Sequence, residues 1–194
     1  MPVTVDYIIV GSGNLFISDT TVDLFGQAGD YVTAPLSTYH VGSTMDGVEV
    51  NYEPDLTDIM VDQLKDAAVI FQNGYKIMVR TNLAEATLNN LKIAWGLADT
   101  SLTGSTASGS TQRLALPISP DEPKERRLMV TGRAPAATAT VNKTRKYCCR
   151  RAISVEASAH ALKRAEATAF PVSFRILADP TYTNAEYGFI EDQW

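Results

Sequence analysis

The order of apolar and polar residues predicts a mainly β protein, because alternation with a period of two places successive side chains on opposite faces of a strand. The clearest alternation runs from Gly47 to Tyr52, where apolar residues are interleaved with carboxylates and an amide. The same period, or a composition rich in β-branched and aromatic residues, marks further strands at residues 5–10, 14–18, 58–62, 75–81, 112–119, 126–132, 145–156 and 171–178. The first two flank Gly11-Ser12-Gly13 and are predicted to form a hairpin.

One helix is predicted to begin after Asn82. Asn82 is a favourable N-cap, and Glu85, three residues later, can complete a capping box. Gly96 is suited to end the helix. The apolar stripe that would cover one face of the sheet comprises Leu83, Leu88, Leu91, Ala94 and Trp95.

The remaining segments indicate loops within a single domain that spans residues 1–194. Residues 100–111 consist mostly of Ser, Thr and Gly, and residues 134–144 carry little pattern, so both are predicted to be long loops. Residues 158–168 have helical propensity but little room between two strands. We favour a strand end followed by a loop there, with a helix as the alternative.

Composition places the chain among globular proteins. Apolar residues make up 45% of the 194 and charged residues 20%, and no secretory signal or apolar stretch of membrane-spanning length is present. The net charge is −5, but residues 1–100 hold 13 acids and 4 bases, whereas residues 101–194 hold 9 acids and 13 bases. This polarity suits docking between copies of the chain; the simpler interpretation is that each charged run is a solvated face.

Motifs for catalysis are absent from the sequence. His40 and His160 are the only histidines and lie in no metal-binding spacing. Asp55, Asp58 and Asp62 do not match a calcium loop. We therefore expect no enzyme activity, cofactor or metal.

A basic run with two cysteines leaves two interpretations open. Cys148 and Cys149 would point to opposite faces of a strand, either as small core residues or as partners in a bond between subunits. The surrounding cations suit a nucleic-acid surface or, as we favour in an acidic chain, a solvated or inter-subunit face. These candidate inter-subunit cations are Arg145, Lys146, Arg150 and Arg151.

Four segments together resemble the tail tube proteins of tailed bacteriophages. They are residues 5–16, residues 47–63 with an acidic strand pair, residues 81–91 with a helix opening, and the closing strand at residues 170–179. The resemblance implies a β-sandwich or half-barrel with one packed helix, in hexameric rings whose inner strands join into a continuous barrel. It also implies a virion structural protein, made in the bacterial cytoplasm, that stacks into the tube through which DNA passes. Expected partners are other copies, the tape measure protein, and tail terminator or baseplate proteins, without sequence-specific DNA binding or a membrane anchor.

The resemblance gives the acidic strand pair a possible role as the lining of the tube. Carboxylates repel the phosphate backbone and would let DNA slide. The acids expected to face the lumen, with their apolar neighbours in the core, are Glu49, Glu53, Asp55, Asp58 and Asp62. Two other hypotheses stay open: another tail ring component, such as a terminator or baseplate protein, and a small β-barrel enzyme or ligand-binding protein.

Overall fold

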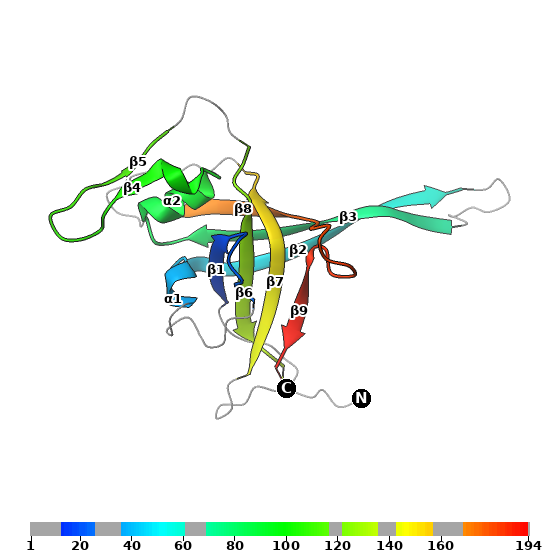
Figure 1. Ribbon diagram of the computed structural model, residues 1–194. Helices are drawn as coiled ribbons and strands as arrows, with labels where there is room; N and C mark the ends of the chain where they lie inside the picture. Colours follow the sequence, from blue (N-terminus) through cyan, green and yellow to red (C-terminus); the bar gives the residue numbers. More distant parts are fainter. Residues whose placement is uncertain are drawn as a thin grey trace.

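One antiparallel sheet of seven strands organises the protein (Figure 1). The computed structural model describes residues 13–25, 36–60, 69–116, 122–135, 143–156 and 169–193. The strands of the sheet are β1 (Asn14–Asp19), β2 (Thr44–Ile59), β3 (Val69–Leu83), β6 (Arg126–Arg133), β7 (Thr144–Ser154), β8 (Phe170–Leu177) and β9 (Gly188–Asp192). They follow the order β1-β6-β7-β8-β3-β2, with β9 also paired to β7. The prediction of a mainly β fold is therefore confirmed, and the described strands do not close into a barrel.

β7 is the branch point of the sheet. One of its edges pairs with β6, while its other edge is divided between β9, which pairs with Arg145–Cys149, and β8, which pairs with Arg151–Ser154. In Figure 1, β8, β3 and β2 run across the direction of β1, β6 and β7. The division lets one strand hold two differently oriented parts of the sheet together.

Two apolar clusters lie on opposite sides of β7. The larger contains Cys149 and buried residues of β1, β3, β6, β8 and the helix α2, and the smaller contains Cys148, Phe16, Leu24 and Met129. Both thiols are buried, which agrees with their interpretation as core residues.

Smaller elements surround the sheet. α1 (Leu36–Tyr39) adjoins β1, and α2 (Leu88–Ala94) packs against β8. After the 3₁₀ turn η2 (Asp99–Ser101), β4 (Leu102–Gly104) and β5 (Gln112–Leu114) form a separate two-stranded sheet. No helix among the described residues is long and apolar enough to span a membrane.

The predicted helix start was wrong. Asn82 lies inside β3, and the N-cap is Thr87, whose hydroxyl accepts a hydrogen bond from the Asn90 N–H at 3.1 Å. The Glu85 carboxylate accepts one from the Ser43 N–H instead of closing a capping box. Gly96, with φ of 64°, follows the helix as expected and donates its N–H to the Ile93 carbonyl.

Several strand and loop predictions also change. The two acidic strands expected at residues 47–62 are one continuous strand, β2, up to Ile59. Part of the expected loop at residues 100–111 forms β4, and β9 was not predicted. Strands β6, β7 and β8 are confirmed. Residues 5–10, Asp62, His160, residues 158–168 and most of the loop at 134–144 lie outside the described part of the chain.

Candidate functional site

The hairpin of β2 and β3 projects far beyond the rest of the sheet (Figure 1). β8 pairs with β3 only from Met78 to Leu83, so residues 69–77 of β3 pair with β2 alone. We call residues 52–59 and 69–77 the arm. Valine, isoleucine, tyrosine and phenylalanine favour the extended chain here, yet a two-stranded ribbon is only marginally stable in water by itself.

The arm exposes large apolar side chains on both of its faces. Directly paired residues share a face in an antiparallel ladder. One face therefore carries Leu56 with Gln72 and Asp58 with Ile70, and the other carries Thr57 with Phe71 and Ile59 with Val69. Ile70 is 61% exposed and Phe71 59%. We call these outer apolar residues, Leu56, Ile59, Val69, Ile70 and Phe71, the tip.

An apolar groove lies at the base of the arm. It has a volume of about 420 Å³, and it is lined by residues of β2 and β3 in and next to the arm and by β7, β8, Tyr187 and β9. Three tyrosines form a ladder along it: the ring centroids of Tyr52 and Tyr75 are 5.2 Å apart, and those of Tyr75 and Tyr187 are 4.9 Å apart. Phe189 and Ile190 of β9 also line the groove, and Ile190, which is 65% exposed, marks its rim.

The sequence-predicted acidic residues lie on the arm and its base. Glu49, Glu53, Asp55 and Asp58 all belong to β2 and are exposed. Their apolar neighbours do not all reach the core as expected: Val48 packs against the main cluster, but Val50, Tyr52 and Ile59 are exposed.

The acidic face is also mixed in charge. Arg80 stands opposite Glu49 and Lys76 opposite Glu53 in the strand register, and alternation along β2 places Asp58 on the other face. Counted over residues 44–60 and 69–83, five acids exceed two bases, so this hairpin still has a net charge of −3.

Three cations of the basic run are held by contacts within the chain. Arg145 forms a two-bond ion pair with Asp192 at 2.5 and 2.6 Å, and the hydrogen bond from Arg145 lowers the pKa of that carboxyl. Arg151 pairs with Glu125, and the Arg150 guanidinium stacks 3.4 Å from the centre of the Tyr182 ring. Lys146 lies opposite Glu191 in β9.

The two cysteines are poorly placed to react. Burial raises the pKa of both Cys148 and Cys149 to about 12, so both remain protonated thiols at neutral pH. A bond between subunits through either residue would need the surrounding core to open.

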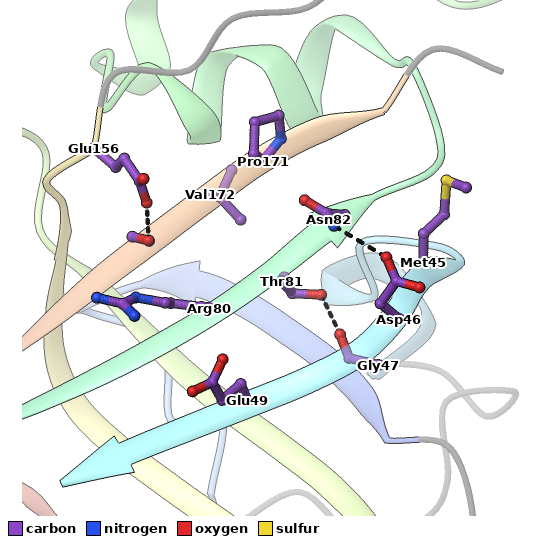
Figure 2. A pocket seen from close by; sticks show the side chains of 11 residues that line it. Met45, Asp46, Gly47, Glu49, Arg80, Thr81, Asn82, Glu156, Pro171 and Val172 are labelled. Atoms are coloured by element: carbon purple, nitrogen blue, oxygen red, sulfur yellow. Dashed lines mark hydrogen bonds between the residues drawn. The ribbon is translucent and has the colours of Figure 1, made fainter. Parts of the chain in front are cut away.

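A polar cleft of about 270 Å³ lies where β2 bulges beside β3 and β8 (Figure 2). Asp46 and Gly47 have φ of 63° and 77°, and the Thr81 hydroxyl donates to the Gly47 carbonyl at 2.7 Å. Arg80 extends between Glu49 and Glu156 in this view, and the Ser173 hydroxyl donates to Glu156. The residues lining the cleft include no histidine or cysteine to act as a base or nucleophile.

The sequence did not predict the arm and the groove, although one apolar run in the arm could have indicated a covered surface. Val69-Ile70-Phe71 is an apolar run without alternation, which indicates a segment covered on both faces.

Among the described residues, no group of three His, Cys, Asp or Glu side chains is placed to hold a metal ion. No protein-family model matches the chain, and no curated protein matches it in sequence.

Proposed function

We propose that this protein is a structural subunit of a bacteriophage tail, which self-assembles into stacked hexameric rings and forms the tube for DNA. The observation that carries the self-assembly is the arm, because it holds apolar side chains in water on both faces of a ribbon. Contiguous exposed apolar surface of this kind marks an interaction site. Fully burying a large aliphatic or aromatic side chain contributes about 1.5–3 kcal/mol, so even partial burial of five such residues in each copy is substantial.

Open strand edges support the same proposal. Among the described strands, none pairs with the outer edge of β2, which is 16 residues long, and such an edge is a template for pairing with another chain. In the ring, the crossed parts of the sheet act as a half-barrel whose edges pair between neighbours into a continuous barrel.

The carboxylates on one face of β2, Glu49, Glu53 and Asp55, are proposed to face the channel. The net charge of −3 on the hairpin supports this, because a surplus of carboxylates disfavours phosphate binding. The partners in the tail are further copies of the chain, the tape measure protein, and terminator or baseplate proteins. DNA passes through without sequence-specific contacts.

Negative-stain microscopy of the purified protein, over a range of concentrations, tests this function. Rings or tubes are expected for the wild type, and Phe71→Asp is expected to abolish them while leaving the far-UV circular dichroism unchanged. Phe71→Leu is the matched control and should still assemble. A protein that stays monomeric at every concentration would contradict the proposal, and a monomer that binds a small apolar ligand in the groove would favour a ligand-binding protein.

A further inference from the structure

The tip of the arm and the groove at its base are two unlike apolar surfaces of the same chain. We propose that the groove of one copy receives the tip of a second copy, so that the subunits join head to tail. This inference rests on the proposed self-assembly and names the two surfaces that carry it.

The tip cannot fill its own groove. Ile59 lies seven residue steps beyond Tyr52, which lines the groove. A strand rises about 3.3 Å per residue, so the two lie roughly 23 Å apart along the ribbon. From Tyr52 outward, the paired ladder between β2 and β3 is continuous to Ile59 and Val69 apart from one bulge, between Asp55 and Leu56. A tip in the groove must therefore come from another molecule.

The groove matches the tip in size and chemistry. Its 420 Å³ is nearly three times the ~150 Å³ of an apolar cavity that holds benzene, so it has room for two or three large side chains. Aromatic rings and branched side chains line it, and the tip offers Leu56 and Ile70 on one face of the ribbon and Phe71 on the other.

The charges around the two surfaces are complementary. The hairpin of residues 44–60 and 69–83 has a net charge of −3. The described segments 122–135, 143–156 and 169–193, which supply β6 to β9, hold ten bases and seven acids, a net charge of +3. Opposite potentials favour approach of an arm to the body of a neighbour over contact between two arms.

A head-to-tail contact has a consequence for the assembly. Each copy keeps a free tip and a free groove after joining one neighbour, so growth continues until a ring closes or a filament forms. A self-complementary contact would instead stop at a dimer.

Cysteine cross-linking tests the contact directly. Ile59→Cys places a thiol on the tip and Ile190→Cys places one on the groove rim, and both positions are exposed, so folding is retained. The natural cysteines are buried and stay silent. After mild oxidation, the mixture of the two variants should give dimers that join residues 59 and 190, identified by peptide mass spectrometry.

Each variant alone is the matched control, because a head-to-tail contact brings neither residue near its own copy. The dimer yield in the mixture should exceed that of either variant alone by roughly tenfold or more, since residues held in contact react at a high effective concentration. Assembly without this cross-link overturns the inference and leaves the proposed function standing. A wild-type protein that does not assemble overturns both the inference and the proposed function. A dimer yield of either variant alone that equals the yield of the mixture shows a self-complementary contact and overturns the inference.

Discussion

Neighbouring residues in this chain have very different surroundings, because the register of the sheet determines which side chains face each of them. Cys148 and Cys149 lie in separate apolar clusters, and Glu49 faces Arg80 across the ladder. Alternation in the sequence predicts that adjacent strand residues point apart. It does not specify which residue of another strand stands opposite, and for that reason the mixed charge of the acidic face could not be predicted.

The N-cap of α2 gives a test at a single hydroxyl. Thr87→Ala should lower the free energy of unfolding by about 1 kcal/mol, because the Asn90 N–H loses its partner. Asn82→Ala is the matched control and should cost less, since Asn82 caps no helix and its hydrogen bond to Asp46 is long, at 3.4 Å, and exposed. Urea denaturation measures both variants. An equal or larger loss for Asn82→Ala would contradict the assignment of the cap.

His40 is expected to make stability depend on pH. Burial lowers the pKa of His40 below its ordinary value of about 6.5, and its Nδ1 accepts the Gly42 N–H at 3.0 Å. Below pH 6.5 the folded state therefore binds fewer protons than the unfolded state. The contribution of neutral His40 to the free energy of unfolding is complete above about pH 6.5 and is lost as the pH falls through the folded-state pKa.

Thermal denaturation between pH 5 and 7 tests the histidine. The melting temperature of the wild type should decrease as the pH is lowered from 7 to 5. The melting temperature of His40→Gln should decrease less steeply. Identical slopes for the two proteins would exclude His40 as the source.

The acids on one face of β2 test the channel assignment. Replacing Glu49, Glu53 and Asp55 with lysine should leave the fold intact, at a cost of about 0.2–1 kcal/mol for each like-charged cross-strand pair created. Tubes should still form, but DNA should bind to them and passage should slow, as measured by ejection rate. Normal ejection from assembled mutant tubes would place this face away from the channel.

Elements of the fold were predictable where alternation, or a composition rich in β-branched and aromatic residues, marks a strand. β6, β7 and β8 were recognised in this way, although residues on both faces of β6 and β7 are buried. The prediction divided β2 between residues 52 and 58, but the strand continues through Pro54, because an edge strand tolerates proline. The helix was placed too early because Asn82 and Leu83 pair with Pro171 and Phe170 of β8, so tertiary pairing overrides a local capping signal. The outer part of β3 escaped recognition because its apolar residues Val69, Ile70 and Phe71 do not alternate with polar ones.

The connection between β4 and β5 is expected to change on assembly. Residues 105–111 are exposed and rich in Ser, Thr and Gly, and their composition provides little to pack. Hydrogen exchange there should be fast in the monomer and slower in the assembled state. The buried strand β8 serves as the internal control, and equal exchange of residues 105–111 in both states would remove the prediction.

For the whole molecule, electrostatic and apolar contacts between copies should respond differently to salt. Attraction between the acidic arm and the basic body is screened above about 0.15 M salt, where the Debye length is near 8 Å. Apolar burial and backbone pairing are not screened. Sedimentation velocity should therefore show slower association at high salt but assemblies that persist once formed. Complete dissociation in moderate salt would mean that electrostatics alone holds the copies together.

The position of the groove in the chain also sets the order of events during synthesis. The arm is complete once residue 83 has been made, but the groove needs Tyr187, which precedes β9, and Phe189 and Ile190 within it. At about 5–20 residues per second, roughly 5–20 seconds pass between the two, so a growing chain has an arm but no groove. Nascent chains on one messenger RNA therefore present tips without acceptors to one another. Only a chain translated through β9 can accept a neighbour, which postpones polymerisation until translation has passed that strand.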